Sequence, residues 1–241
     1  MTRVVILAGG KGCRLAPYTT VIPKPLMPLG DRPILDVVLR QLKRYDLTDI
    51  TIAVGHLADL IVAYCGDGGR YGVRIGYTER ETTPLGTAGS LSVVPGLTST
   101  FLVMNGDLLT TLDYGELLAF HKAQQACATI SVCERDAQIS HGVIEIDAAN
   151  RVSAYVEKPT FHYHVSMGIY VFEPEVLSLI PAGCPYDVPD LVKELLSRGR
   201  RVAAYRFDGY WQDIGRLDDS QRAVEDFENS PSEFLRADSL A

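Results

Sequence analysis

The sequence predicts an α/β protein with a mostly parallel, mixed sheet that is flanked by helices and joined to a smaller lobe. Strand-like apolar runs alternate with helical patterns through the first half, and such alternation implies crossover connections between parallel strands. A glycine-rich loop directly follows the first predicted strand, at the kind of position where open α/β sheets bind ligands. Beyond residue 140, strand-like segments follow one another with little helix between them, which indicates an antiparallel or mixed extension of the sheet.

The first half carries the clearest periodicities. Residues 4–7 form a continuous apolar run that ends at a pair of glycines, as is typical of a buried parallel strand. Ile34, Val38, Leu42 and Tyr45 recur at helical spacing. We expect further strands at 50–54, 73–77, 100–104 and 127–133, and further helices at 57–64, 87–94 and 113–125.

The second half is predicted to be richer in strands, at 142–147, 151–156, 166–172 and 202–207. The segment Asp187-Val188-Pro189 opens a helix to about 198, since proline is tolerated in the first helical turn. Another helix is expected at 216–228, and the polar residues 229–241 are expected to form a frayed C-terminal tail. We find no internal repeat and no linker, so we expect a single domain over residues 1–228.

Composition excludes several classes of protein. The chain is 46% hydrophobic and 22% charged, and no apolar run approaches the roughly 18–20 residues of a membrane-spanning helix. Its start lacks the features of a signal peptide, so we expect a cytoplasmic protein without a membrane partner. The net charge of −7 argues against a nucleic-acid partner, although a few local cations can still hold a small anion.

Neither the cysteines nor the histidines have the spacing of a metal site. The cysteines are odd in number and form no CxxC pair, so we expect reduced thiols at Cys13, Cys65, Cys127, Cys133 and Cys184. We assign no metal to the histidines, which are His56, His121, His141, His162 and His164.

The loop after the first strand combines glycines with fixed cations. Gly9, Gly10 and Gly12 can expose backbone N–H groups to an anion. Arg14 lies in the same loop, and Lys24 stands between two prolines that stiffen its backbone. The Walker pattern is absent, and a dinucleotide fingerprint would need glycine at position 15. These residues indicate a phosphate site; the alternative is a tight turn beside two solvated cations.

Several segments in a fixed order resemble the sugar-1-phosphate nucleotidylyltransferases. They are LAGGKGCRL (7–15), PKPLMPLGDRPIL (23–35), PLGTAGSL (84–91), NGD (105–107), EKP (157–159), SMGIYVF (166–172) and WQDIG (211–215). The resemblance extends from residue 1 to about 228. It implies a Rossmann-like fold and the transfer of a nucleoside monophosphate from a nucleoside triphosphate to a sugar 1-phosphate, with release of pyrophosphate.

The resemblance implies that nucleotide binding falls mainly to residues 1–135. The implied nucleotide-binding residues are Leu7, Ala8, Gly9, Gly10, Gly12, Cys13, Arg14, Pro84, Gly86, Thr87, Ala88 and Gly89. Small residues at 84–90 would let a purine ring approach the backbone, and PLGTAG is closest to guanylyl members, which favours GTP. SMGIYVF is closer to the adenylyl branch, so adenylyl, uridylyl and thymidylyl transfer remain alternatives. Cys13 replaces the family's usual threonine, so we expect a hydroxyl contact to phosphate to be lost.

The chemistry that the resemblance implies needs no general base. The second pKa of a phosphate monoester is near ~6, so the attacking sugar phosphate is already ionised at neutral pH. Catalysis must therefore come from positioning and electrostatic stabilisation. By resemblance, Arg14 supports the triphosphate and the departing pyrophosphate, while Lys24 stabilises charge between the two substrates.

Two carboxylates are candidates for a Mg²⁺ site. Asp107 ends an apolar strand, and magnesium prefers one or two carboxylates plus substrate phosphates. The resemblance brings Asp213 to the same ion and makes Asp107 a catalytic residue. The alternatives are that Asp107 caps a turn and that Asp213 caps the helix from Arg216.

The resemblance implies that residues 136–215 form mainly the sugar side, the smaller lobe. The implied sugar-phosphate residues are Asn105, Gly142, Glu157, Lys158, Ser166 and Gly168. Glu157 would accept hydrogen bonds from the sugar hydroxyl groups, and Lys158 would form an ion pair with the sugar phosphate. By resemblance, the favoured sugar is mannose 1-phosphate or a manno-heptose 1-phosphate, and a second copy of the chain is an expected partner in a homodimer. The rival to an enzyme is a regulatory nucleotide-sugar-binding protein, which would be expected to have lost Arg14, Lys24 or Asp107.

Overall fold

The computed structural model describes residues 2–80 and 83–235, and a seven-stranded sheet forms its centre. The strands lie in the order β12 (Val202–Arg206), β8 (Ala128–Gln138), β11 (Thr160–Phe172), β6 (Phe101–Asn105), β1 (Arg3–Ala8), β4 (Asp49–Val54) and β5 (Arg74–Tyr77). Strand β1 is parallel to β4 and β6, whereas β11 is antiparallel to β6 and β8. The predicted α/β class with a mostly parallel, mixed sheet is therefore confirmed.

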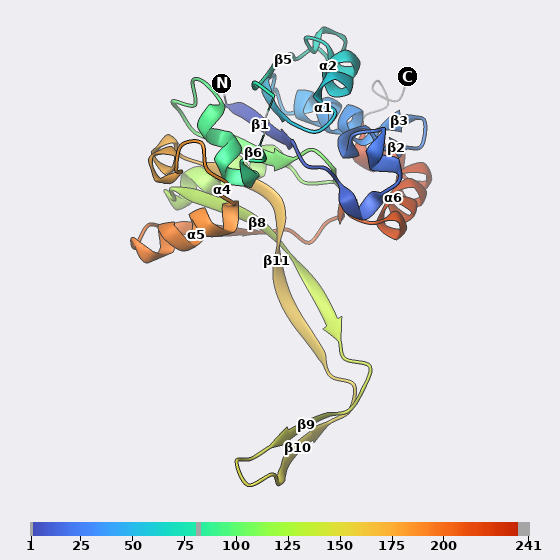
Figure 1. Ribbon diagram of the computed structural model, residues 1–241, viewed down its shortest axis with the longest axis vertical. Coiled ribbons are helices and arrows are strands. Elements are labelled where there is room, and N and C mark those ends of the chain that lie inside the picture. The colour runs from blue at the N-terminus through green and yellow to red at the C-terminus, as the bar shows by residue number, and fades with distance from the viewer. Residues whose placement is uncertain (1, 81–82, 236–241) are drawn as a thin grey trace.

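Helices flank this sheet (Figure 1). They are α1 (Ile34–Arg44), α2 (Ala58–Cys65), α3 (Gly86–Gly89), α4 (Tyr114–Gln124), α5 (Val188–Ser197), α6 (Leu217–Asn229) and α7 (Pro231–Phe234). The side chains of β1 point alternately to the two faces of the sheet, and both faces are covered. Val4 and Ile6 join the larger core cluster with α1, whereas Val5 joins a second cluster that includes α5. A strand whose successive side chains all enter a core reads as an uninterrupted apolar run.

Three short strand pairs lie outside the main sheet. They are β2 (Pro28–Leu29) with β3 (Arg32–Pro33), β7 (Leu108–Thr110) with β13 (Trp211–Asp213), and β9 (Val143–Ile146) with β10 (Val152–Val156). The prediction that 142–156 extends the main sheet is therefore wrong, because β9 and β10 pair only with each other in the part of the chain that is described. Strand β11 provides the antiparallel extension, and it begins at Thr160 rather than at residue 166.

The chain after α6 is more ordered than the sequence predicted. Helix α6 continues to Asn229 and α7 follows directly. Phe234 is 2% exposed, and its ring meets that of Tyr210 edge to face with centroids 5.1 Å apart. Aromatic packing thus holds residues 231–234 against the body, and the rest of the predicted tail, 236–241, lies outside the described residues.

A long two-stranded ribbon projects from the body. Figure 1 shows β8 and β11 continuing beyond the sheet to the β9–β10 hairpin, which lies far from the rest of the molecule. Residues 134–138 of β8 and 160–164 of β11 are exposed, whereas 167–172 of β11 are buried in the body. We call residues 134–164 the arm.

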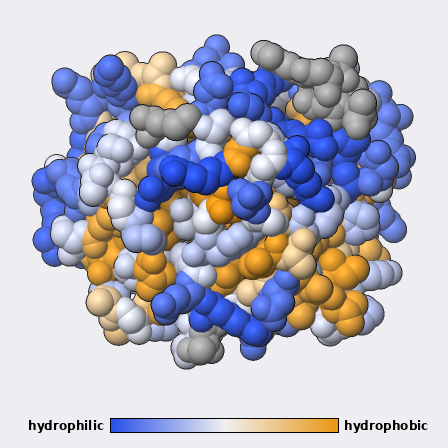
Figure 2. All heavy atoms as spheres, turned by 90° about the horizontal axis from the view of Figure 1, so that it is seen from above, coloured by the Kyte–Doolittle hydropathy of each residue, from blue (hydrophilic) through white to orange (hydrophobic). Residues whose placement is uncertain are grey.

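The surface of the body is mixed in character. Seen from the end away from the arm, hydrophilic and hydrophobic residues are interspersed (Figure 2). No helix in residues 2–80 and 83–235 is both long and apolar enough to cross a bilayer.

Candidate active site

The carboxyl ends of β1 and β6 bring Asp107 to the glycine loop. The two strands are parallel, and the N–H of Gly106 donates to the carbonyl of Leu7 at 3.0 Å. Parallel strands end at the same edge of a sheet, which places the residues that follow β1 and β6 side by side. The predicted phosphate loop and the predicted metal ligand therefore share one edge.

Pairing between β7 and β13 brings the second carboxylate to this edge. Asp213 lies opposite Leu108, and the N–H of Ile214 donates to the Asp107 carbonyl at 3.2 Å. Helix α6 has Arg216 as its N-cap, without a side-chain capping bond. The helix-capping alternative for Asp213 is therefore wrong.

Lys24 lies between the two carboxylates. Its Nζ forms an ion pair with Oδ2 of Asp107 and lies 3.3 Å from Oδ1 of Asp213. The Lys24 side chain is 13% exposed, and a 3₁₀ turn over Lys24–Leu26 follows Pro23. The lysine that the sequence predicted to be held in place is held by both its backbone and its partners.

Asp107 has the properties of a metal ligand, because one of its two carboxylate oxygens is unsatisfied. Its Oδ1 atom is buried and has no hydrogen-bond partner among residues 2–80 and 83–235. Burial raises the pKa of the Asp107 carboxyl above its ordinary value, and Lys24 acts in the opposite direction. A buried, unsatisfied carboxylate oxygen is costly unless a cation or donor meets it. Asp107 with Asp213 offers the oxygen atoms that Mg²⁺ prefers, so these residues fit a magnesium site.

The glycine loop keeps its shape through close backbone contacts. Gly12 has φ of +61°, and a Cβ there would lie 2.9 Å from Cγ2 of Thr19. The Thr19 hydroxyl donates to the Gly12 carbonyl at 2.9 Å, and the His56 N–H donates to the Gly9 carbonyl at 3.2 Å. A Cβ at Gly10 would meet nothing within 4 Å, so this glycine faces open space.

Arg14 lies at the far side of the same loop. A Cβ at Gly215 would be 3.3 Å from Nη2 of Arg14, which places the guanidinium against the segment after Asp213. Arg14 has no ion pair with any residue in the described ranges 2–80 and 83–235. Its charge is therefore available to an anion in the loop.

Two adjacent cavities meet at Asp107. The first, of about 290 Å³, is lined by Leu7, Ala8, Gly10, Gly12, Cys13, Arg14, Lys24, Pro25, Asp107 and Gly215. The second, of about 480 Å³, is lined by Leu7, Gly9, Gly10, Lys11, Gly55, His56, Arg80, Pro84, Gly86, Thr87, Ser90, Asn105, Asp107 and Asp187. Together they contain every predicted nucleotide-side residue except Ala88 and Gly89, which are buried behind Thr87 in α3.

The PLGTAG segment is held by the chain before α5. The N–H of Thr87 donates to Oδ1 of Asp187 at 2.8 Å, and those of Ala88 and Gly89 donate to the Tyr186 carbonyl at 3.0 and 2.7 Å. These three N–H groups therefore already have partners within the chain, so they are not available to hydrogen-bond a purine ring near this segment. The Thr87 hydroxyl accepts from the N–H of Val188 and so caps α5.

The predicted sugar-side residues fall into two separate groups. Asn105, Ser166 and Gly168 lie in the body, where β11 has an irregular register and a Cβ at Gly168 would be 2.6 Å from Nδ2 of Asn105. Gly142, Glu157 and Lys158 lie in the arm, far from the glycine loop (Figure 1). Of the predicted sugar-side residues, Asn105 lines a cavity together with Asp107, and Gly168 lies against Asn105.

The arm residues form a cluster of their own. The Tyr155 hydroxyl donates to Oε2 of Glu157 at 3.0 Å, and Nζ of Lys158 lies 4.0 Å from Oε1 of Glu157. A Cβ at Gly142 would collide with the Tyr155 hydroxyl. The predicted sugar-binding residues of the EKP segment are therefore already assembled with Gly142, but away from the nucleotide side.

Four residues of the larger cavity at Asp107 were not predicted from the sequence. Lys11, His56, Arg80 and Asp187 line the larger of the two cavities at Asp107. Lys11 could have been singled out, because it stands within the glycine run. The other three come from distant segments with no signal of their own, and only the fold brings them together.

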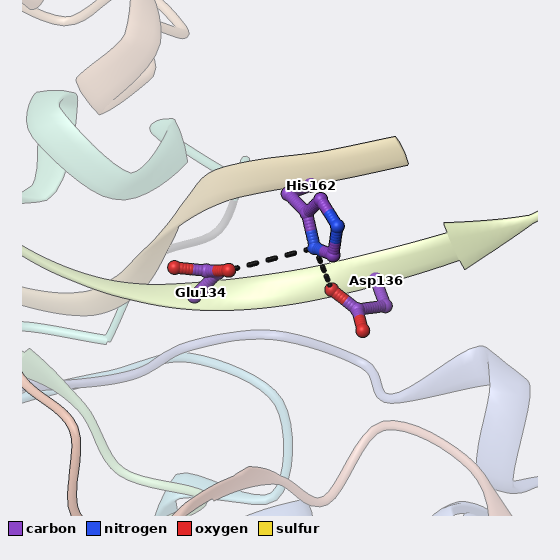
Figure 3. A group of neighbouring side chains, drawn as sticks. All are labelled: Glu134, Asp136 and His162. Atoms are coloured by element: carbon purple, nitrogen blue, oxygen red, sulfur yellow. Dashed lines mark hydrogen bonds and ion pairs between the residues drawn. The ribbon is translucent and has the colours of Figure 1, made fainter. Parts of the chain in front are cut away.

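A group of possible cation ligands lies at the root of the arm. Nδ1 of His162 is 2.6 Å from Oδ1 of Asp136 and 3.5 Å from Oε1 of Glu134 (Figure 3). The register of β8 and β11 creates this group, since His162 lies opposite Asp136. All three side chains are exposed, so we assign no metal to them.

Another cavity, of about 760 Å³, lies away from this edge of the sheet, beside His121 and Glu173. His121 is buried, and its ring nitrogens lie 2.7 Å from Oγ1 of Thr129 and 3.2 Å from Oε1 of Glu173. Both ring nitrogens of His121 therefore have partners, and we interpret His121 as a structural residue of the core.

Comparison with known proteins identifies the family of the chain. The Nucleotidyl transferase family model matches residues 3–230, so the chain belongs to that family. The predicted family is therefore confirmed.

Individual relatives differ in their substrates. The chain is 34% identical over 241 residues to a UTP–glucose-1-phosphate uridylyltransferase of Synechocystis, and 33% identical over 224 residues to a mannose-1-phosphate guanyltransferase of Saccharomyces cerevisiae. These alignments cover 92% and 89% of this chain, which spans 62% of the length of each relative. The structure of HddC from Yersinia pseudotuberculosis complexed with GMP-PN has a TM-score of 0.72 and 26% identity, and covers 94% of this chain and 100% of its own.

Proposed function

We propose that the protein transfers a nucleoside monophosphate from a nucleoside triphosphate to a sugar 1-phosphate, giving a nucleotide sugar and pyrophosphate. GTP is the favoured nucleotide, and mannose 1-phosphate or a manno-heptose 1-phosphate is the favoured acceptor. The observation that carries the proposal is the position of Lys24, which stands between Asp107 and Asp213 beside the glycine loop.

The reaction joins two molecules that repel each other. An oxygen of the sugar phosphate forms a bond to the α-phosphorus, and the bond from that phosphorus to the bridging oxygen of the β-phosphate breaks. No proton has to be removed, since the nucleophile is already anionic. The remaining barrier is electrostatic, so fixed positive charge placed where the phosphates meet is the main requirement.

Lys24 and Arg14 would supply this positive charge at two different positions in the site. Lys24 is restrained by two prolines and two carboxylates, so its charge is preorganised rather than recruited during the reaction. Arg14 faces the segment after Asp213 and can take up charge on the leaving pyrophosphate. Backbone N–H groups around Gly10 would hold the triphosphate at a position where no side chain intervenes.

Asp107 and Asp213 would hold the magnesium ion. When bound, the ion would neutralise charge on the phosphate oxygens and so favour attack at the α-phosphorus. The unsatisfied Oδ1 of Asp107 supports this assignment from the chain's own atoms. The nearby Lys24 keeps the two carboxylates close together by offsetting their mutual repulsion.

Fewer observations bear on which base the nucleotide carries. The PLGTAG segment and the guanyltransferase names of several relatives support GTP. UTP is a specific alternative, because the Synechocystis relative is named a uridylyltransferase. Adenylyl or thymidylyl transfer and a catalytically inactive regulatory protein are further alternatives.

A substrate panel tests the proposal. Purified protein with Mg²⁺ is incubated with each of GTP, UTP, ATP and dTTP and with a set of sugar 1-phosphates, and released pyrophosphate is measured. We expect the fastest release with GTP and a manno-configured acceptor. Faster release with another nucleotide would replace GTP, and nucleotide binding without turnover for every pair would favour the regulatory alternative.

A further inference from the structure

The arm exposes an unusual share of apolar side chains. Eight of the sixteen exposed large hydrophobic residues found in 2–80 and 83–235 fall between 139 and 163. They are Ile139 (40% exposed), Ile144 (52%), Ile146 (65%), Val152 (65%), Tyr155 (62%), Val156 (49%), Phe161 (42%) and Tyr163 (53%). A concentrated apolar surface of this kind marks an interaction site.

The hairpin lacks packing partners of its own. Strands β9 and β10 form a separate two-stranded sheet, and an isolated two-stranded hairpin is at best marginally stable in water. A standard dimer interface buries about 800 Å² per partner, and eight large hydrophobic residues that are each at least 40% exposed can contribute to an interface of that size. In a dimer that exchanges arms, both arms would contribute such a surface to the interface.

The body carries a second exposed apolar group. It consists of Tyr18, Val21 and Ile22, in the loop that leads to Lys24, and Leu217 at the start of α6. Tyr18, Ile22 and Leu217 line a surface cavity of about 720 Å³ on this side of the molecule. An apolar surface next to the catalytic loop could receive the apolar arm.

The direction of the arm is fixed at its root. Arg135 donates through Nη2 to the Trp211 carbonyl at 2.8 Å, and its guanidinium lies 5.0 Å from the centre of the Trp211 ring. Trp211 belongs to β13, the strand that carries Asp213. This anchor holds the arm pointing away from its own glycine loop (Figure 1).

The residues predicted for the sugar side lie in two separate places within one chain. Asn105, Ser166 and Gly168 lie in the body, whereas the cluster of Gly142, Glu157 and Lys158 is carried away on the arm. Lys158 supplies a cation that is 60% exposed, as a residue that pairs with an incoming phosphate should be. A second chain can bring this cluster to the site.

We propose that the protein works as an arm-exchanged homodimer, in which the arm of each chain completes the sugar-phosphate side of the site on its partner. This inference rests on the proposed function for the role of the cluster, but not for the dimer itself. A two-fold axis would make the exchange reciprocal, so that both sites are completed by the same contact.

The first test is the oligomeric state, measured by sedimentation without any substrate. The wild-type protein is expected to be a dimer at micromolar concentration, and Ile144→Asp with Ile146→Asp is expected to give a monomer that still binds nucleotide. Leu196→Asp, an equally exposed apolar position outside the arm at 59%, is the matched control and should remain dimeric. A monomeric wild-type protein, or a double variant that stays dimeric, would overturn the proposal.

The second test mixes two inactive variants. One carries Asp107→Asn in the body, and the other carries Glu157→Gln with Lys158→Asn in the arm; asparagine suits the positive φ of 46° at position 158. After dissociation and reassociation, mixed dimers should contain one intact site, and about a quarter of wild-type activity should return. No recovery despite proven subunit exchange would mean that each arm serves its own chain. Lys24→Ala replaces Asp107→Asn if the latter fails to fold.

The two tests separate this inference from the proposed function. If no substrate pair supports turnover but Ile144→Asp with Ile146→Asp converts the dimer to a monomer, the arm contact is confirmed and the assigned reaction is wrong. If turnover is found with a monomer, the reaction stands and arm exchange is wrong.

Discussion

The Nζ atom of Lys24 lies 3.3 Å from Oδ1 of Asp213, although 189 positions separate the two residues in the chain. Lys24 comes from the proline-flanked loop after β1, and Asp213 from β13 near the end of the fold. The pairing of β13 with β7 closes this distance and places Asp107 next to both. The sheet edge therefore gathers one cation and two carboxylates, which is the charge arrangement that our proposal requires.

Lys24→Ala should abolish most turnover while leaving the fold intact. Loss of one preorganised charge in a shielded site typically costs about 10²–10³ in rate. Pyrophosphate release measures the effect, and circular dichroism checks the fold. The control is Lys193→Ala, which removes a surface lysine whose side chain is 76% exposed and pairs with Asp190. Rates like those of the wild type in Lys24→Ala would remove this residue from the mechanism.

Asp107→Asn should greatly reduce metal-dependent activity, because an amide retains the shape but not the charge that attracts Mg²⁺. Activity is titrated against Mg²⁺, and the remaining activity should need a higher metal concentration. Asp46→Asn is the matched control: Asp46 is exposed, and its φ of 56° is also accessible to asparagine. Undiminished activity of Asp107→Asn at limiting Mg²⁺ would exclude a ligand role.

Gly10→Ala should weaken nucleotide binding without changing stability. A Cβ at Gly10 would meet no atom within 4 Å, yet it would project into the space lined by the glycine loop. Gly76→Ala is the control, since a Cβ there also meets nothing within 4 Å but lies on the edge strand β5. We expect equal melting temperatures for both variants and a higher KM for the nucleotide only in Gly10→Ala. Equal KM values would place the triphosphate elsewhere.

Thiol reactivity should divide the cysteines into two classes. Burial raises the pKa of Cys65 to about 12 and raises the pKa values of Cys127 and Cys133 above the ordinary range, so these thiols remain protonated and unreactive at pH 8. The exposed Cys13 and Cys184 should react with a thiol reagent in the native protein.

Nucleotide with Mg²⁺ should then protect Cys13, in the glycine loop, but not Cys184. Mass spectrometry identifies the modified residues. Equal protection of both cysteines, or of neither, would argue against nucleotide binding at the loop.

Much of the fold could be predicted from the sequence because its core elements have strong local patterns. The apolar run at 4–7 became β1, buried on both faces, and the helical spacing from Ile34 became α1. The glycine loop and the lysine between prolines were found for the same reason, since glycine and proline restrict the backbone in known ways. The charged residues around Lys24 were brought together by the family resemblance rather than by periodicity.

The arm could not be predicted in this way. Alternating apolar residues at 143–146 and 152–156 look the same whether they cover their own sheet or a neighbouring chain. The group of Glu134, Asp136 and His162 depends on strand register, which no local pattern reveals. The occupied N–H groups of Thr87, Ala88 and Gly89 depend on a segment about 100 positions away, which meets them only in the folded chain.

A crystal structure with a bound, non-hydrolysable nucleoside triphosphate and Mg²⁺ tests the central claim most directly. We expect the phosphates against residues 9–14, the metal on Asp107 and Asp213, and Lys24 and Arg14 in contact with phosphate oxygens. A triphosphate bound away from these glycines, with neither basic side chain in contact, would contradict the proposed mechanism.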